Sequence, residues 1–165
     1  MTRIVTPDEM MKRVARFDQI KPSKKAFVDH VFKECHRDIY DVIGKGVTED
    51  PSSKPVIDAV EYFNLTYAGC EPGHGAGLHS HKTVEVFIPM SGRWEVVWGD
   101  AGENRVELGP LDVISVPIDV MRAFRNIGDE YALLMAIQGG ADPGKVEWSP
   151  SVLDAVEKSE RLAKA

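Results

Sequence analysis

Three of the five histidines, His74, His79 and His81, fall within eight residues, and Glu85 follows closely. Side chains alternate between the two faces of a β-strand, so we expect His79, His81 and Glu85 to share one face. Two imidazoles and a carboxylate inside a small barrel are costly to bury unless something satisfies them. A divalent ion does so, because these donors suit Fe, Mn, Ni or Zn, and non-haem iron oxygenases use two histidines and one carboxylate. We therefore predict metal ligands at His79, His81 and Glu85.

The spacing of these residues resembles the first motif of the cupin superfamily. That motif reads Gly, five residues, His-x-His, three or four residues, Glu, six residues, Gly. The matching positions in this sequence are Gly73, His79, His81, Glu85 and Gly92. The resemblance implies a mainly β fold, the double-stranded β-helix or jelly-roll cupin barrel, over residues 56–140, and it supports the same three metal ligands.

The second cupin motif is degenerate in this chain. It reads Gly, five residues, Pro-x-Gly, two residues, His, three residues, Asn. Pro117 and Asn126 match, but Leu111 and Asp119 replace the two glycines, and Arg122 replaces the histidine that is the fourth metal ligand of the family. A guanidinium cannot ligate a metal because it has five donors and no acceptor. Strand parity with Asn126 predicts that Arg122 points inward, and a solvent-facing charge is the alternative.

Two functions are compatible with Arg122 at this position. In the first, a three-ligand metal persists and Arg122 is the catalytic residue that holds an anionic substrate. This predicts a divalent-metal-dependent enzyme acting on a small organic acid, dioxygenase-like or an isomerase or lyase. In the second, Arg122 forms a buried ion pair with Glu85 in place of the metal. This predicts a metal-free cupin that binds or senses a small molecule.

The remaining histidines and the cysteines have less specific patterns. His74 is a possible additional ligand, but the glycines on both sides favour an exposed loop position. His30 and His36 are expected at the surface. Cys35 and Cys70 are too few for a disulfide framework or a thiolate zinc site, and Cys70 is expected to be a buried structural thiol.

Short β-rich runs alternate with turns from residue 56 onward, with no helical pattern between them. This texture predicts an antiparallel sandwich or barrel. The expected strands cover residues 62–67, 84–88, 94–98, 113–116, 123–126 and 132–137.

The two ends of the chain have helical patterns. Thr6-Pro7-Asp8-Glu9 is a helix start, and apolar residues recur at helical spacing until Pro22. Residues 23–50 are ambiguous, with candidate strands at 26–28 and 39–43. The predicted organisation is an N-terminal helix and extension (1–55), a cupin barrel (56–148) and a C-terminal amphipathic helix (149–165).

The composition excludes several classes of protein. The chain has 165 residues and a net charge of −6, which suits one compact domain and argues against nucleic acid or an anionic membrane as a partner. No apolar run approaches the ~20 residues of a membrane span, and the start lacks the apolar stretch of a secretory signal. We therefore expect a cytoplasmic protein with a small-molecule ligand. Resemblance to small cupins also implies a homodimer that pairs through sheet edges.

Overall fold

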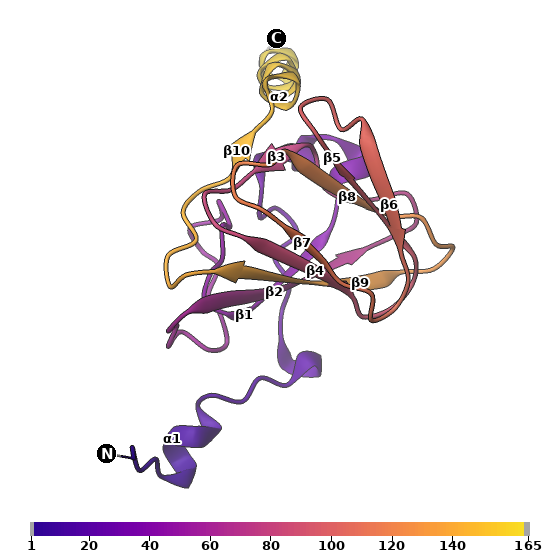
Figure 1. Cartoon of the computed structure of the whole chain (residues 1–165). Helices are drawn as coiled ribbons and strands as arrows, with labels where there is room; N and C mark the ends of the chain where they lie inside the picture. The colour runs from indigo at the N-terminus through magenta and orange to yellow at the C-terminus, as the bar shows by residue number, and fades with distance from the viewer. Residues whose placement is uncertain (1, 164–165) are drawn as a thin grey trace.

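The computed structural model describes residues 2–163 and contains two five-stranded antiparallel sheets (Figure 1). The first sheet has the strand order β1 (Asp38–Ile43), β2 (Phe63–Cys70), β9 (Ala132–Gly139), β4 (Glu85–Pro89) and β7 (Ile114–Val116). The second has the order β10 (Glu147–Trp148), β3 (His79–Ser80), β8 (Arg122–Asn126), β5 (Trp94–Trp98) and β6 (Asn104–Leu108). This architecture confirms the predicted mainly β fold class.

The core lies between the two sheets, where the alternating inward side chains of both meet. Phe87 and Leu134 come from the first sheet, and Trp94, Val96 and Phe124 from the second, and each is at most 8% exposed. The ring centroid of Phe124 lies 5.3 Å from that of Phe87 and 5.9 Å from that of Trp94, in edge-to-face contacts. Tilted aromatic pairs of this kind stabilise the packing of the two sheets beyond the area they bury.

The N-terminal helix is shorter than the sequence predicts. The predicted start is confirmed by a reciprocal capping box, in which Thr6 N donates to Glu9 Oε2 (2.8 Å) and Glu9 N donates to Thr6 Oγ1 (3.3 Å). However, α1 covers only Pro7–Met11, so the prediction of a helix up to Pro22 is wrong. None of the residues of α1 is buried, and a short helix that packs on nothing has little to stabilise its extension.

Single 3₁₀ turns and one long helix complete the described chain. The turns are η1 (Phe17–Gln19), η2 (Val28–Val31) and η3 (Lys33–Cys35), and the predicted C-terminal helix is α2 (Pro150–Ala163). Between residues 2 and 163, no helix combines the length and the apolar character needed to cross a membrane.

The ambiguous segment before residue 50 contributes one strand to the first sheet. The candidate strand at 39–43 corresponds to β1, which pairs with β2 so that Asp41 faces Thr66. The candidate strand at 26–28 is wrong, because the 3₁₀ turn η2 already begins at Val28. The ring of Phe27 packs inward against the guanidinium of Arg37 (4.7 Å) and Trp148 (6.1 Å). The division of the chain at residues 55 and 148 stays a prediction.

Candidate metal centre

The three predicted metal ligands meet, although they do not lie on one strand. His79 lies on β3 in the second sheet and Glu85 begins β4 in the first, with His81 in the connection. The prediction of a single β-segment is therefore wrong, because the chain crosses from one sheet to the other after Ser80. One potential ligand atom from each residue nevertheless lies within 4.8 Å of the other two. All three residues are buried, with at most 5% exposure.

Both imidazoles are held in the neutral form that metal binding requires. His79 Nδ1 lies 2.7 Å from the carbonyl oxygen of Gly77, which can only accept a hydrogen bond, so Nε2 carries the free lone pair. Burial, with smaller contributions from His81 and Arg122, lowers the pKa of His79 well below its usual value. Burial and the charge of Arg122 lower the pKa of His81 to about 3. Among the residues that the structure describes, none offers a hydrogen-bond partner to His81 Nδ1.

Two side chains hold the oxygens of Glu85. Oε2 accepts a hydrogen bond from Arg122 Nε (3.0 Å) and lies 3.5 Å from His81 Nε2, while Oε1 accepts one from Gln138 Nε2 (3.2 Å). Burial raises the pKa of Glu85, and the contacts with Arg122 and Gln138 oppose this effect. Both donors therefore favour the ionised carboxylate, which is the form that binds a metal.

Arg122 points into the fold and is fully buried, so the solvent-facing alternative is wrong. It is the register partner of His79 in the β3–β8 pair. Its Nη1 donates to the carbonyl oxygen of Val120 (2.9 Å), and its Nη2 has no partner among residues 2–163. A permanent positive charge thus lies at the position where the second cupin motif has its histidine.

The chemistry of the remaining donor set fits a divalent ion. Two neutral imidazoles and one carboxylate suit Fe, Mn, Ni or Zn, at bond lengths of about 2.0–2.2 Å. Such bonds place neighbouring ligand atoms roughly 3 Å apart. The potential ligand atoms of His79, His81 and Glu85 lie within 4.8 Å of one another, so small side-chain rotations would bring them to this spacing. Oε2 of Glu85 has two lone pairs, so it can bind a metal with one while it accepts the hydrogen bond from Arg122 with the other. In this arrangement Arg122 orients the Glu85 carboxylate towards the metal. The three residues could therefore hold a metal ion.

The site opens onto a small cavity of about 50 Å³. One water needs roughly 10–15 Å³ by this measure, so the cavity has room for a ligand of only a few non-hydrogen atoms. The N-terminal segment closes one side of it, with Phe27, Ile39 and Val47, and Trp148 closes another. The part of the chain outside the cupin motifs thus determines how much space the site has.

A row of polar side chains crosses the inner face of the first sheet to reach this cavity. Asp41, Thr66, Gln138 and Glu85 lie on the adjacent strands β1, β2, β9 and β4, and Asp41 and Gln138 are positions that sequence reasoning missed. Asp41 is 4% exposed, and burial raises its pKa to about 6. Its Oδ2 accepts a hydrogen bond from the hydroxyl of Ser53, and its Oδ1 finds no partner in the described part of the chain. A lone carboxylate inside an apolar strand was the signal that could have identified Asp41.

The other reactive side chains lie outside the metal centre. His74 Nδ1 contacts the carbonyl oxygen of His36 (3.1 Å), so His74 is held at the surface and does not join the ligands. His36 is exposed and His30 half-buried. Burial raises the pKa of both Cys35 and Cys70 to about 12, which agrees with the prediction that Cys70 is a structural thiol.

The family model described as "Cupin domain" matches residues 67–138, a range that includes every residue of this centre. Residues 67–138 of this chain belong to the cupin superfamily. No curated protein matches the sequence of this cupin.

Solved structures with the same fold are distant in sequence. The oxalate decarboxylase of Lactobacillus farciminis, in complex with formate, is 18% identical with a TM-score of 0.59, and the match covers 89% of this cupin and 38% of that chain. The polyketide cyclase RemF of Streptomyces resistomycificus is 14% identical with a TM-score of 0.59, with coverage of 88% and 96%. The DMSP lyase DddQ of Ruegeria pomeroyi is 18% identical with a TM-score of 0.54, with coverage of 68% and 51%. At these identities the likeness shows a shared fold.

This cupin keeps the backbone of the second motif without its glycines. Leu111 (φ 71°) and Asp119 (φ 61°) are the two non-glycine residues with positive φ among those described. Left-handed backbone costs a side-chain-bearing residue about 1 kcal/mol or more. The turn at Asp119 contributes to the site because its N–H donates to the carbonyl oxygen of His81 (2.9 Å). Asn126 holds a neighbouring turn through bonds from Nδ2 to the carbonyl oxygens of Cys70 and Glu130.

Proposed function

We propose that this cupin is a divalent-metal-dependent enzyme that acts on a small organic acid, by a dioxygenase-like, isomerase or lyase reaction. The observation that carries the proposal is the convergence of the buried side chains of His79, His81 and Glu85 beside a small cavity, with both imidazoles neutral. A bound ion would supply Lewis acidity or activate oxygen.

The residues around the ligands have separate roles in this proposal. Gln138 and Arg122 each hold one oxygen of Glu85, which fixes the carboxylate relative to the two histidines. Arg122 retains one buried donor, Nη2, beyond its bonds to Glu85 and Val120. Leaving a buried donor unpaired costs about 1–3 kcal/mol, so an anionic group that reaches Nη2 gains a charge-assisted hydrogen bond. Arg122 is therefore the residue that we assign to orient the substrate.

The cavity limits the size of the substrate. A volume of about 50 Å³ suits an acid with a few non-hydrogen atoms and excludes a sugar phosphate or a polyketide unless the N-terminal segment moves. The oxalate decarboxylase that shares this fold was solved with formate. Formate and oxalate are therefore suitable probes of the right size and charge.

A two-step titration tests the proposal. Chelator-treated protein is titrated with Mn²⁺, and the loaded protein is then titrated with formate or oxalate, each followed by calorimetry. The proposal expects saturable Mn²⁺ binding that is lost in His79→Ala, and binding of the acid that requires the metal. Mn²⁺ binding of equal strength in wild type and His79→Ala would contradict it.

One observation favours a second function, a metal-free binding module. Arg122 Nε and Glu85 Oε2 form a fully buried ion pair at 3.0 Å, which places positive charge near the histidines without a metal. In this case formate binds chelator-treated wild type as well as metal-loaded protein, and Arg122→Met abolishes the binding.

A further inference from the structure

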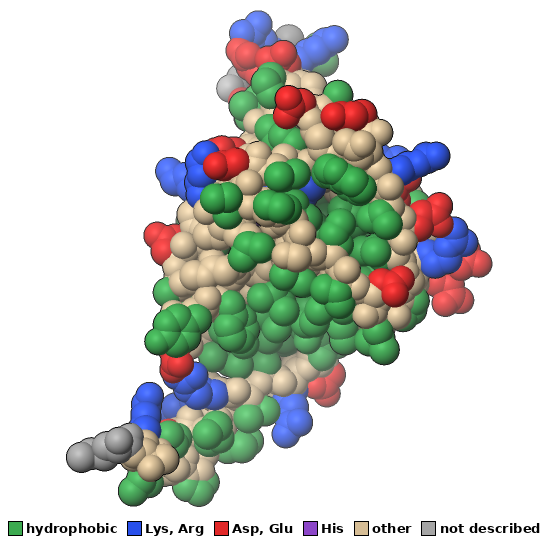
Figure 2. All heavy atoms as spheres, in the orientation of Figure 1, with side chains coloured by type: hydrophobic (Ala, Val, Ile, Leu, Met, Phe, Trp, Pro, Cys, Tyr) green, Lys and Arg blue, Asp and Glu red, His purple; other side chains and the backbone are tan. Residues whose placement is uncertain are grey.

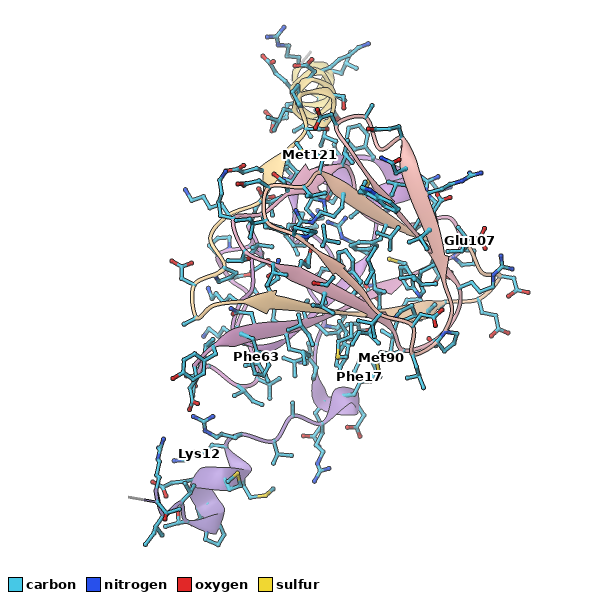
Figure 3. All side chains as sticks on the ribbon, viewed as in Figure 1. Lys12, Phe17, Phe63, Met90, Glu107 and Met121 are labelled. Atoms are coloured by element: carbon cyan, nitrogen blue, oxygen red, sulfur yellow. The ribbon has the colours of Figure 1, made fainter. Side chains whose placement is uncertain are left out.

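The first sheet carries polar side chains on its inner face. Figure 2 shows hydrophobic side chains gathered over the outer face of this sheet, and Figure 3 places Phe63 and Met90 along that side of the barrel. Asp41 and Thr66 lie on the inner side, where both line the cavity beside the metal centre. A sheet with one face in water normally has the opposite pattern, with apolar residues inward and polar residues outward. The polar groups on the inner face therefore indicate a cavity that receives a polar ligand.

Asp41 has one carboxylate oxygen with a hydrogen-bond partner and one without. It lies on β1, two residues after the core residue Ile39, and is 4% exposed. Oδ2 accepts a hydrogen bond from the hydroxyl of Ser53, whereas Oδ1 is buried and finds no partner between residues 2 and 163. A buried oxygen without a donor is unfavourable, unless it holds a proton or contacts a ligand. Oδ1 is therefore the atom through which Asp41 can interact with an occupant of the cavity.

Asp41 also connects the cavity with the surface. On its other side it borders an open pocket of about 300 Å³, together with Ser53, Lys54, Lys21 and Asp50. A hydroxyl both donates and accepts hydrogen bonds, so the half-buried Ser53 can pass a proton between solvent and the carboxyl. A proton can thus reach Asp41 without passing the metal ligands.

The groups around Asp41 allow it to change its charge near neutral pH. Burial raises the pKa of Asp41 to about 6, and the charge of Asp50 adds to this effect. The hydrogen bonds from Ser53 and Thr66 and the charge of Lys45 oppose it. Asp41 can therefore gain or lose a proton in response to another charge that comes close.

Buried ion pairs neutralise two other charged groups of the inner cavity. Arg37 lies 3.0 Å from Asp29, and Glu85 lies 3.0 Å from Arg122. Both histidine ligands are neutral because burial lowers their pKa values. An ionised Asp41 would thus meet an incoming acid anion as an unpaired like charge, which favours the protonated carboxyl.

We propose that Asp41 takes up a proton when a small acid anion enters the cavity, and that the protonated Oδ1 donates a hydrogen bond to the anion. This role rests on the proposed function, because the anion is the substrate that we assign to this cavity. The proton comes from solvent and forms an O–H bond on Oδ1, and no bond of the anion breaks. Asp41 is then a substrate-binding residue that β1 contributes from outside both cupin motifs.

The small size of the cavity determines how strongly the anion and Asp41 interact. A compact volume of about 50 Å³ is only ~5 Å across, so an anion inside it lies within roughly 7 Å of a wall atom such as Oδ1. At that distance and an effective dielectric constant of about 20–40, one negative charge strengthens proton binding by a carboxyl roughly 10–50-fold. The expected uptake at pH 7 is then roughly 0.4–0.7 proton per bound anion. It falls to ~0.2 or less at pH 5.5, where Asp41 already holds its proton, and at pH 8.5, where proton binding is too weak.

Calorimetric titration of the Mn²⁺-loaded protein with formate, in buffers of different ionisation enthalpy, measures this uptake. The slope of the binding enthalpy against the ionisation enthalpy of the buffer gives the number of protons taken up per formate. Wild type is expected to show the largest uptake near pH 7, and Asp41→Asn is expected to bind formate without uptake. Asp50→Asn is the matched control and should retain the uptake. Asp50 accepts hydrogen bonds from Ser23 and Ser52 and borders the surface pocket rather than the inner cavity.

Two results would overturn the role of Asp41 and leave the proposed function intact. One is formate binding by wild type without proton uptake at pH 7, and the other is equal uptake in wild type and Asp41→Asn. If Asp41→Asn does not fold, the wild-type profile decides, because uptake that increases from pH 7 to pH 5.5 would contradict a group that is already protonated there. Failure of both formate and oxalate to bind, with or without Mn²⁺, would refute the proposed function and this role together.

Discussion

Asp41→Asn should remove the part of the pH dependence of stability that comes from the buried Asp41 carboxyl. Burial raises the pKa of Asp41 from 3.8 to about 6, with Asp50 adding to the effect and Ser53, Lys45 and Thr66 opposing it. The folded state therefore binds this proton more tightly than the unfolded state. The stabilisation from the proton is complete below pH 3.8 and is lost as the pH rises through 6.

The magnitude follows from the two pKa values. Each unit of difference between the folded and unfolded pKa values is worth 1.36 kcal/mol, so the Asp41 proton stabilises the fold by about 3 kcal/mol at low pH. About 2–3 kcal/mol of this stabilisation is lost between pH 4 and pH 7. The free energy of unfolding of Asp41→Asn relative to wild type is thus expected to rise by that amount across this range. Asn retains a similar shape and does not titrate.

Urea unfolding of wild type and Asp41→Asn at pH 4, 5, 6 and 7 measures the effect. The comparison requires that the free energy of unfolding falls with urea concentration at the same slope in both proteins. All other titrating groups are shared, so their contributions cancel in the difference between wild type and Asp41→Asn. A difference that stays constant within about 0.5 kcal/mol would refute the reasoning, because Asp41 would then ionise as freely in the fold as in the unfolded chain.

Three further predictions concern the second cupin motif. Arg122→Met should lower the free energy of unfolding by about 3–5 kcal/mol, because it leaves the buried Glu85 without its partner, and Glu85→Gln/Arg122→Met should recover much of this loss in urea titrations. Arg122→His should strengthen Mn²⁺ binding by at least about tenfold, or about 1.4 kcal/mol, in calorimetry; unchanged affinity would show that residue 122 is not at the fourth-ligand position. Leu111→Gly should raise stability by about 1 kcal/mol by relieving positive φ at a 74% exposed residue. Leu111→Ala keeps the strain and serves as its control.

The fold class and the convergence of the ligands followed from local patterns in the sequence. The strand predicted at Trp94–Trp98 is confirmed to the residue, because the run consists mostly of aromatic and β-branched residues and its first inward positions, Trp94 and Val96, are buried. Strand β6 was missed because three of its five residues are polar and exposed, which is typical of an edge strand rather than a core strand. Strands β3 and β10 have two residues each, too short for any periodicity.

The parts of the site that escaped prediction depend on long-range pairing. His79 and Glu85 approach each other from two sheets, and only the complete strand order shows this. The contact of Gln138 with Glu85 depends on the β4–β9 register, and Asp41 enters the cavity through β1, outside the cupin motifs. Parity placed Arg122 inward, and its contact with Glu85 was one of the two alternatives that the sequence left open.

Metal content is the most direct test of the central claim that His79, His81 and Glu85 form a metal centre. Elemental analysis of protein purified without added metal, and again after reconstitution, should find close to one Fe, Mn, Ni or Zn per chain in wild type. His79→Ala should lose it, and His74→Ala, which removes a surface histidine outside the cluster, should retain it. Folded wild-type protein that takes up no metal after reconstitution, or equal metal in wild type and His79→Ala, would contradict the claim.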